Sequence, residues 1–240
     1  SLYSFVAGSG GSGDVSGNDV SFNHIGVAHL RGLNKIIWGD FKTSWSQLGS
    51  SISGIGNHDY FGKSISFNDT GDMVVVGIPG EDEGGSGRGQ VRVYRYIHNT
   101  WVQAGQTIIG LQNDELFGES VDINGPGDTI IVGGPNSDLG GSNRGVARIY
   151  KLTRHYRNDG EWVQIGSDIY GVVNSAYCGA SVSINSPGDI VAISSRGEGH
   201  NYSSSGTTRV YYFNGTNWTV QGTLHGVQSS EYSGRKPQSI

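Results

Sequence analysis

The sequence predicts an all-β protein, a β-propeller of four-stranded antiparallel blades with about four repeats in its 240 residues. Glycine accounts for 41 residues, about 17% of the chain against a usual ~7%, which indicates many tight turns between short strands. Three similar phrases, SISFNDTGDMVVVGIPG, SVDINGPGDTIIVGGPN and SVSINSPGDIVAISSRG, begin at residues 64, 120 and 181. Tryptophans recur at spacings of 56, 61 and 56 residues, at Trp45, Trp101, Trp162 and Trp218. A period of this length indicates an array of equivalent units.

Each unit contains four strand-like segments. The first segment, SISF, SVDI or SVSI, alternates polar and apolar residues, as expected of a strand with one buried face. The second, MVVVG, TIIVG or IVAIS, is almost continuously apolar, which is typical of a strand covered on both faces. The third, VRVY, ARIY or TRVY, alternates again, and the tryptophan phrase supplies the fourth. No segment shows convincing helical periodicity with caps.

The connections between these segments are short. A Thr-Gly-Asp or Pro-Gly-Asp triplet follows each first segment and predicts a type II turn, so the first two strands should form a hairpin. The same up-and-down order then continues through the third and fourth strands. The predicted units lie at residues 16–54, 55–110, 111–171 and 172–226, with the start of a further blade at 227–240.

A four-stranded sheet of this size cannot bury both of its faces alone. Packing successive sheets around an axis, as in a propeller, covers them. A solenoid is the alternative, but its repeats are usually shorter and its strands parallel. The first unit is about one loop shorter than the others, and Cys178 stands where two units have Phe. We expect a closed four-blade ring, a segment of a larger ring or array, or a ring completed by another chain.

A Phe-Gly pair precedes the first strand of two units, at Phe61-Gly62 and Phe117-Gly118, and the phrases VVVGIPG or IIVGGPN, VRVY and W-x-Q-x-G follow in register. This pattern resembles FG-GAP repeats, the blades of integrin-α-type propellers. It is most similar to the variant that reads W-x-Q-x-G, F-G-x-S-V and G-D in extracellular proteins of algae and bacteria. The resemblance covers residues 16 to 234. It implies an extracellular propeller, and propellers of this family commonly have seven blades.

Calcium often sits in the turn between the first two strands of such blades, where a loop of about nine residues supplies the six or more oxygen ligands that the ion needs. Here one turn offers only Asn68, Asp69 and Asp72, and the other turns offer less. We expect these residues to form the turns rather than a metal site. The sequence therefore predicts no cofactor and no metal-binding residues.

The overall charge excludes some partners. The formal net charge is −5, and the 16 basic residues are scattered singly, so there is no basic stripe for nucleic acid. No apolar run reaches the ~18 residues of a membrane span, and the N-terminus lacks the features of a signal peptide. The single cysteine excludes an internal disulfide. We find no motif that predicts catalytic residues.

The loops between the second and third strands are long, and they predict an acidic rim. The predicted partner-binding residues of this rim are Glu81, Asp82, Glu83, Asp138 and Glu198. Loops on a rigid scaffold often bind ligands, so the rim could receive a cationic partner, a cation or a sugar. It could equally be a solvated face.

Four triplets match the N-glycosylation acceptor pattern, at Asn68, Asn201, Asn214 and Asn217. Such triplets also arise by chance in a chain rich in Asn, Ser and Thr. We interpret them as glycosylation sites of a protein located outside the cell or on its surface.

Two further sets of residues follow the repeat. The tryptophans are expected to pack between blades, with sugar stacking as the less favoured interpretation. Three aspartates recur in step with three arginines, and a charge-assisted bond across strands is expected between them. The pairs are Asp72 with Arg92, Asp128 with Arg148, and Asp189 with Arg209.

These features predict a non-enzymatic extracellular module for structure or adhesion that presents binding loops on a propeller rim. The alternative is a glycan-binding lectin, and an enzyme built on a propeller is the least favoured hypothesis. The expected partners are other protein chains or surface glycans, within a larger assembly.

Overall fold

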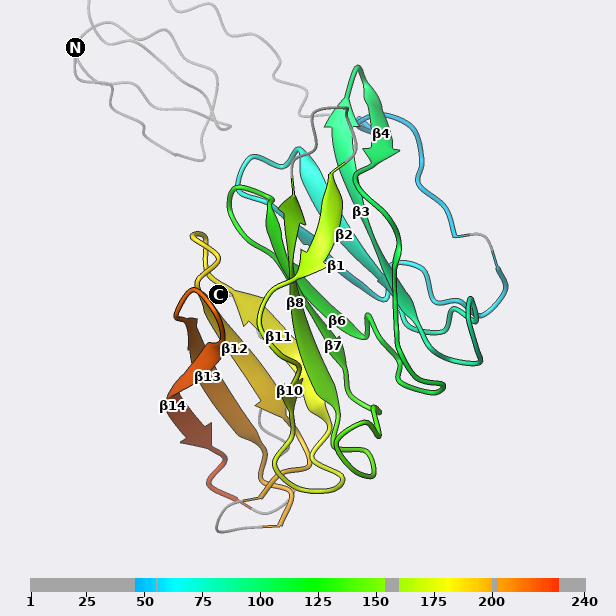
Figure 1. Cartoon of the computed structure of the whole chain (residues 1–240). Helices are drawn as coiled ribbons and strands as arrows, with labels where there is room; N and C mark the ends of the chain where they lie inside the picture. The colour runs from blue at the N-terminus through cyan, green and yellow to red at the C-terminus, as the bar shows by residue number, and fades with distance from the viewer. Residues whose placement is uncertain (1–45, 55, 154–159, 200–202, 229–240) are drawn as a thin grey trace, which may run out of the picture. The chain divides into compact units, whose positions relative to one another are not determined.

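The computed structural model describes residues 46–54, 56–153, 160–199 and 203–228. The chain divides into two compact units, residues 1–47 and 48–240, and every strand described here belongs to the second. This part of the chain is all-β, with antiparallel strands (Figure 1). No helix that is long and apolar enough to cross a membrane occurs in the described ranges.

The strands form three similar sheets. Sheet 1 contains β1 (Ser64–Phe67), β2 (Met73–Ile78), β3 (Gln90–Ile97), β4 (Thr100–Gln103) and β5 (Ile108–Ile109). Sheet 2 contains β6 (Ser120–Ile123), β7 (Thr129–Gly134), β8 (Val146–Thr153), β9 (Glu161–Gln164) and β10 (Ile169–Tyr170). Sheet 3 contains β11 (Cys178–Ile184), β12 (Ile190–Ser195), β13 (Thr207–Phe213) and β14 (Trp218–His225). The sheets lie within the predicted units 55–110, 111–171 and 172–226, and most of the predicted unit 16–54 lies outside the described residues.

Each sheet runs up and down as predicted, and sheets 1 and 2 depart from the prediction only in the fourth strand. In sheets 1 and 2 that strand is split into two short pieces, and both pieces pair with the third strand. Gly105 and Gly166 cause the break because their φ angles of 76° and 73° lie in the left-handed region. In sheet 3 the fourth strand, β14, is continuous.

The turn between the first two strands is built by an asparagine. The Asn68 Oδ1 atom accepts the Met73 amide at 2.9 Å, and its Nδ2 atom donates to Asp72 Oδ1 at 2.8 Å. Gly71 has a φ of 70°, as a type II turn requires. Asn124 with Asp128 and Asn185 with Asp189 repeat the arrangement. The predicted hairpin is confirmed, and these Asn and Asp side chains serve the turns.

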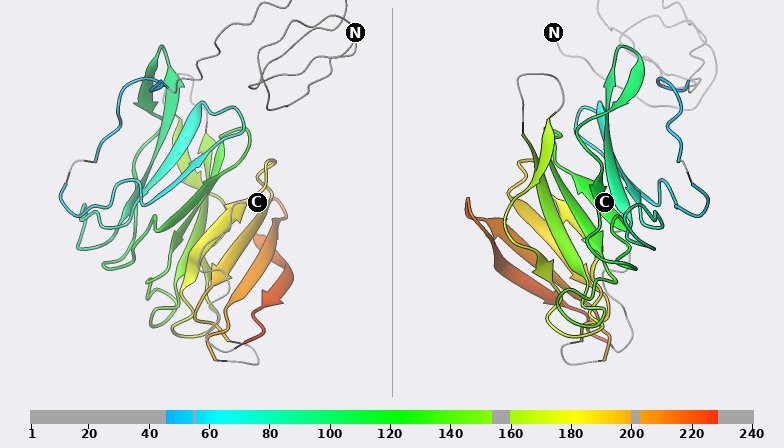
Figure 2. Two further views of the ribbon diagram at one scale, coloured as in Figure 1. Left: turned by 180° about the vertical axis from the view of Figure 1, so that it is seen from behind. Right: turned by 45° about the vertical axis from the view of Figure 1, so that its right-hand side comes forward.

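Two apolar clusters bind the sheets together. One includes Val75 and Val93 of sheet 1 with Ile130 and Val132 of sheet 2, and the other joins sheet 2 to sheet 3. Every residue of β2 and β7 is buried, as their continuous apolar sequences predict. Because burying one such side chain stabilises by roughly 1.5–3 kcal/mol, these clusters dominate the stability of the stack. Figure 2 shows the stacking from two further sides.

Cys178 belongs to the second cluster and is buried. The site that holds Phe in the other two units is therefore repacked around a smaller side chain.

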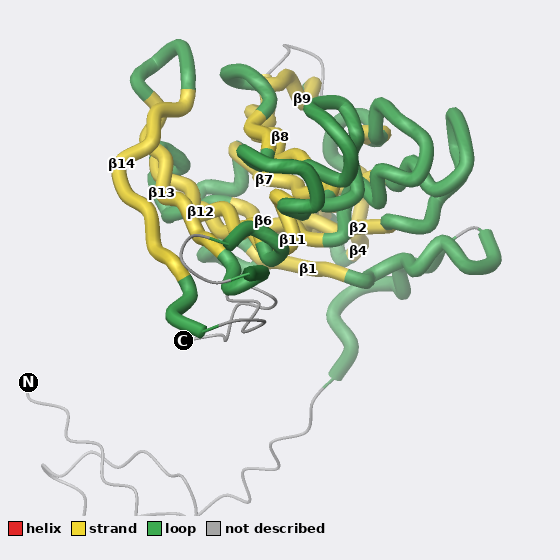
Figure 3. Tube along the Cα trace, turned by 90° about the horizontal axis from the view of Figure 1, so that it is seen from below, coloured by secondary structure: helices red, strands yellow, loops and turns green. Residues whose placement is uncertain are grey.

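The first strands of the three sheets lie next to one another. β6 contacts both β1 and β11, which Figure 3 shows from below. The Ser64 hydroxyl donates to the Gly118 carbonyl at 2.7 Å, and the Ser120 hydroxyl donates to the Gly179 carbonyl at 2.8 Å. Such a close approach of backbones requires small residues in the stacking contact.

Candidate functional site

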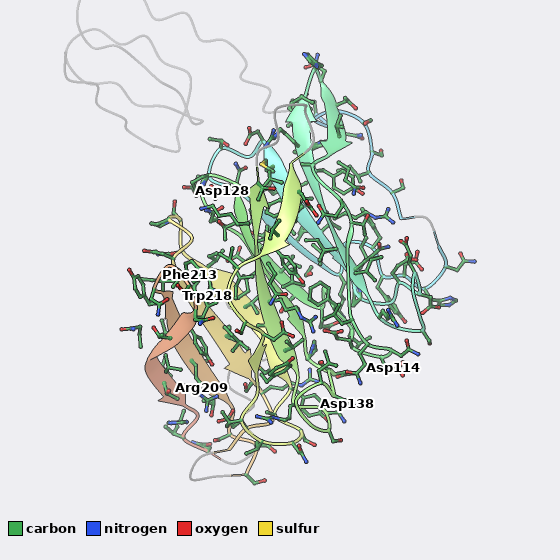
Figure 4. All side chains as sticks on the ribbon, in the orientation of Figure 1. Asp114, Asp128, Asp138, Arg209, Phe213 and Trp218 are labelled. Atoms are coloured by element: carbon green, nitrogen blue, oxygen red, sulfur yellow. The ribbon has the colours of Figure 1, made fainter. Side chains whose placement is uncertain are left out.

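Three arginines occupy the same register position in the three sheets. Arg92 pairs with Val76, Arg148 with Val132 and Arg209 with Ile193, each across the second and third strands. Figure 4 shows Arg209 at the same end of the sheets as Asp114 and Asp138, whereas Asp128 lies at the other end. Because the long loops gather at the arginine end, this end of each sheet brings charged residues together. We call each arginine with its surrounding carboxylates an arginine cluster.

The carboxylates reach the arginines from two loop positions. The first position precedes the first strand and holds Asp59, Glu115 or Ala176, whose carbonyls accept from equivalent amides at 3.0, 3.3 and 2.9 Å. The second position follows the second strand and holds Glu81, Ser137 or Glu198, whose carbonyls accept from glycine amides at 3.0, 2.9 and 2.9 Å. The matching backbone bonds show that the positions are equivalent. Each sheet therefore has at least one carboxylate for its arginine.

In sheet 2 the carboxylate comes from the first loop position. Arg148 pairs with Glu115, and neither side chain is exposed. Arg148 Nε also donates to Asp168 Oδ2 at 3.0 Å, and Gln164 and Tyr170 donate to the same carboxyl group. Burial alone would raise the pKa of Asp168, but these hydrogen bonds and the charge of Arg148 lower it below its ordinary value.

In sheet 3 the carboxylate comes from the second loop position. Arg209 binds Glu198 through both terminal nitrogens, with Nη1 to Oε2 at 2.8 Å. The hydrogen bonds that Arg209 donates to Glu198 raise the pKa of Arg209. Glu198, predicted as a residue of the binding rim, is buried in this bidentate ion pair.

Sheet 1 departs from the pattern because it has a carboxylate at both loop positions. Burial raises the pKa of Glu81, and the hydrogen bond and negative charge of Asp59 raise it further. Asp59 is itself buried and accepts the Gly56 amide at 2.6 Å. Glu81 therefore holds its proton more readily than an ordinary glutamate, because a like charge lies beside it.

Three polar side-chain atoms beside this pair have no hydrogen-bond partner among the described residues. Gln90 and Arg92 are two residues apart and therefore lie on the same face of β3. Gln90 is fully buried, yet neither its Nε2 nor its Oε1 atom has a hydrogen bond to a described residue, and the same holds for Arg92 Nε. Both residues lie close enough to lower the pKa of Glu81, although the Gln90 side chain makes no hydrogen bond of normal geometry to a described residue. In the other two clusters the unpartnered buried polar atoms within the described ranges are Arg148 Nη2 and, in a sheet 3 loop, Ser205 Oγ.

Backbone strain orients the first loop position. His58 and Tyr60, on either side of Asp59, have φ angles of 68° and 57°. The equivalent residues of sheet 2 have φ angles of 57° and 55°, and those of sheet 3 have the same two values. Left-handed backbone is costly for residues other than glycine, so the repeated pair indicates a loop shape that aims the intervening side chain inward.

The other predicted rim residues lie outside the clusters. Asp82 accepts the Gly87 amide at 2.6 Å and Asp138 accepts the Asn143 amide at 2.5 Å, so both brace their own exposed loops. Glu83 is exposed. Of the five predicted residues, Glu81 and Glu198 belong to arginine clusters. The sequence interpretation missed Glu115 and Asp168 as arginine partners and Asp59 as the neighbour of Glu81, although the alternation of carboxylates between two loop positions was a usable signal.

The predicted pairing of arginines with turn aspartates is wrong. Asp72 is held by Thr70 and Asn68, and Asp128 lies 3.9 Å from Lys151. The Tyr96 amide donates to the Asp72 carbonyl, which places Asp72 four residues along the ladder from Arg92, about 13 Å at strand spacing.

The predicted glycosylation sites differ in exposure. Asn68 is buried, and its side-chain nitrogen donates to Thr70 and Asp72. Asn214 and Asn217 are exposed, and Asn201 lies outside the described residues. Glycosylation stays a prediction.

The tryptophans connect neighbouring repeat units through hydrogen bonds of their indole groups. The Trp101 indole donates to the Leu48 carbonyl at 3.0 Å, Trp162 to Ala104 at 2.8 Å and Trp218 to Ile165 at 3.1 Å. Each acceptor follows the preceding tryptophan of the repeat by three residues. The tryptophans thus act in packing, the interpretation favoured by the sequence.

No family model and no curated protein matches the chain. Solved structures with a similar fold include the following three. One, provisionally named a 6-phosphogluconolactonase and from Bacteroides uniformis, has a TM-score of 0.48 and 12% identity, with 72% of this chain and 42% of that chain covered. Sqt1 from Chaetomium thermophilum has a TM-score of 0.45 and 12% identity, with 71% and 37% covered. A periplasmic gluconolactonase of Pseudomonas aeruginosa has a TM-score of 0.34 and 10% identity, with 74% and 59% covered. The chain spans less than two thirds of the length of each.

These findings correct several expectations from the sequence. The assignment to FG-GAP repeats is not supported, because no family model matches and the three similar structures carry other names. The expected non-enzymatic adhesion module or lectin is not supported either, since no family model and no curated protein matches the chain and two of those structures are named as lactonases. An extracellular location and partners among protein chains or surface glycans stay predictions.

Proposed function

We propose that the three sheets are consecutive blades of a β-propeller. We further propose that the Asp59–Glu81 pair is an acid–base site that hydrolyses an ester bond in a small hydroxylated substrate. The observation that carries the second proposal is the departure of sheet 1 from the repeat, with two adjoining carboxylates where sheet 3 has only Glu198. Sheet 2 also has a second acid, Asp168, but that carboxylate is bound by Arg148 and by Gln164. In sheet 1 the two carboxylates adjoin each other instead.

The propeller proposal rests on the stacking of the sheets. Ile65 and Phe67 of β1 are exposed, whereas Val121 and Ile123, at the same positions of β6, are buried against sheet 1. The apolar side chains of β6 in sheet 2 are covered by sheet 1, whereas the equivalent side chains of β1 in sheet 1 are exposed. A further blade on this side would cover them.

The chemistry follows from the protonation of the pair. Its raised pKa lets Glu81 keep a proton at a pH where an ordinary glutamate has lost it, so Glu81 can act as a general acid toward the leaving oxygen. Asp59 as the carboxylate can accept a proton from the attacking water. Arg92 Nε and the Gln90 side-chain amide, which are buried and have no hydrogen-bond partner among the described residues, can donate to the carbonyl oxygen as negative charge develops. Water and the ester give an acid and an alcohol, with no further reactant.

Glucono-1,5-lactone and its 6-phosphate are the first substrates to test, because the names of two similar structures concern sugar lactones. With TM-scores below 0.5 and identities of 10–12%, those names select the assay and support nothing further.

The test measures proton release from each lactone by the full chain near neutral pH, above the spontaneous rate. We expect hydrolysis by the unmodified protein and a loss of about 100-fold or more in kcat/KM for Glu81→Gln and Asp59→Asn. Glu83→Gln, an exposed change two residues away, is the matched control and should retain full activity. Absence of catalysis in the unmodified protein, or full activity in Glu81→Gln, would refute the proposal.

A further inference from the structure

Tyr60 directly follows Asp59 and is prominently exposed. Its exposed fraction is 63%, which is high for a large aromatic residue. Its φ of 57° lies in the left-handed region, where a bulky residue is rarely found unless the surroundings hold it there. Strain of this kind is often associated with ligand sites. The same left-handed φ recurs at the equivalent residues of the other sheets, so the loop shape has a structural cause. The exposed side chain of Tyr60 is therefore the feature that needs an explanation.

The ring lies against the loop that carries the second acid. A Cβ atom added to Gly80 would come within 2.7 Å of the Tyr60 ring and 2.3 Å of the His58 carbonyl oxygen, so only glycine leaves room for this ring. Gly80 directly precedes Glu81. Tyr60 is therefore adjacent in the chain to one carboxylate of the pair and packs beside the residue that precedes the other.

The equivalent residues of the other sheets are different. Leu116 in sheet 2 is aliphatic, and Asn136 takes the place of the glycine. Tyr177 in sheet 3 lies beside Gly197 in the same way, but the Arg196 guanidinium covers its ring at 4.7 Å from the centroid. No ring or cation contact to Tyr60 occurs among the described residues. An uncovered aromatic face thus occurs in the same sheet that has the paired acids.

We propose that Tyr60 is the residue that selects a sugar ring as the substrate, by stacking on the apolar C–H face of the ring while its polar groups meet Asp59, Glu81, Gln90 and Arg92. The inference rests on the proposed acid–base site and gives its substrate class. A flat amphipathic ring with an exposed face suits a ligand that is apolar on one face and polar at its edge. The arginine that covers Tyr177 would block the same interaction in sheet 3.

The experiment compares three variants of the full chain. Tyr60→Asn removes the ring and tolerates the left-handed backbone, Tyr60→Phe keeps the ring, and Tyr177→Asn is the matched control at the equivalent strained position. For each variant, KM and kcat are measured with glucono-1,5-lactone and with a small acyclic ester. The binding of D-gluconate is measured by titration calorimetry, and thermal unfolding confirms that each variant is folded.

We expect Tyr60→Asn to raise KM for the lactone and the Kd for gluconate about five- to tenfold, with kcat within about twofold of the unmodified protein. KM for the acyclic ester should not change, and Tyr60→Phe and Tyr177→Asn should behave like the unmodified protein. An unchanged KM for the lactone in Tyr60→Asn would overturn the inference and leave the proposed hydrolysis standing. If the unmodified protein hydrolyses neither lactone, the proposed function fails. In that case gluconate binding decides the inference, because binding lost in Tyr60→Asn supports it and equal or absent binding overturns it.

Discussion

Arg148 and Glu115 form an ion pair in which neither side chain is exposed to solvent. Removing one partner of such a pair strands a buried charge, which is more costly than losing an exposed pair. Sheet 3 satisfies the same arginine position from the other loop, with Glu198 in place of Ser137 and Ala176 in place of Glu115. The two carboxylate positions should therefore be exchangeable.

We expect Glu115→Ala to lower the free energy of unfolding by roughly 3 kcal/mol, because Arg148 would retain only Asp168. The double change Glu115→Ala with Ser137→Glu, which copies sheet 3 into sheet 2, should recover at least half of the loss. Glu119→Ala, which breaks the exposed pair with Lys63, should cost less than about 1 kcal/mol. Urea unfolding measures all three. A double variant no more stable than the single one would show that the positions are not equivalent.

The contact between sheets 2 and 3 depends on the absence of a side chain at Gly133. A Cβ atom there would stand 2.1 Å from the Gly179 carbonyl oxygen. Gly133→Ala should therefore force the sheets apart and destabilise the protein by about 3 kcal/mol or more. Gly222→Ala, where an added Cβ meets nothing within 4 Å, is the control and should change stability by less than about 0.5 kcal/mol. Equal unfolding midpoints for the two variants would contradict this account.

Glu81 should make stability depend on pH. Its pKa is raised above the ordinary value of 4.5, by burial and then by Asp59, so the folded protein holds a proton that the unfolded chain has released. The stability from this group is fully present below pH 4.5 and is lost as pH rises toward the folded-state pKa. The free energy of unfolding of Glu81→Gln is measured in urea across this pH range. Relative to that of the unmodified protein, it should increase as the pH rises. A difference that does not change with pH would show that the pKa of Glu81 is not raised in the folded protein.

The pH dependence of stability that Asp168 contributes has the opposite sign. Its pKa is lowered in the folded state despite burial, because of Gln164 and Arg148, so its contribution is present above its ordinary pKa of 3.8 and lost as pH falls below it. The Asp168→Asn variant lacks this contribution at every pH, so its stability should fall less than that of the unmodified protein as the pH is lowered. Urea unfolding between pH 5 and pH 2 measures it, since the two proteins should converge in stability at the acid end. Parallel curves would refute the assignment.

Cys178, the single cysteine of the chain, should be unreactive in the folded protein. Burial between sheets 2 and 3 raises the pKa of its thiol to about 12, and the thiolate is the reactive form. A chromogenic disulfide reagent should therefore label no thiol in the native protein and one thiol per chain in guanidinium chloride. Rapid labelling under native conditions would show that the interface between the sheets opens readily.

Much of the fold could be predicted because its signals are local. The hairpins follow from Asn68, Gly71 and Asp72, which bond to one another within a few residues. The apolar run of β2 likewise predicts a strand covered on both faces. The split fourth strand was not predicted, because the sequence pattern alone does not reveal that Gly105 adopts a positive φ.

The candidate site was harder to predict because its parts are distant in the sequence. Glu115 and Arg148 are 33 residues apart, whereas Glu198 and Arg209 are 11 residues apart. The predicted aspartate partners each stand 20 residues before their arginine, a separation between those two, but they lie at the other end of the strands. An extended strand of only a few residues separates its two ends by more than an ion pair can span.

The sequence by itself determined the period, the hairpins, the buried central strands and the packing role of the tryptophans, since hydrophobic alternation and turn residues act over short distances. Only the tertiary structure decided which carboxylate serves each arginine and that sheet 1 has one acid more than sheet 3. The physical reason is that two loops from different parts of a unit converge on one end of the third strand only after the sheet has formed.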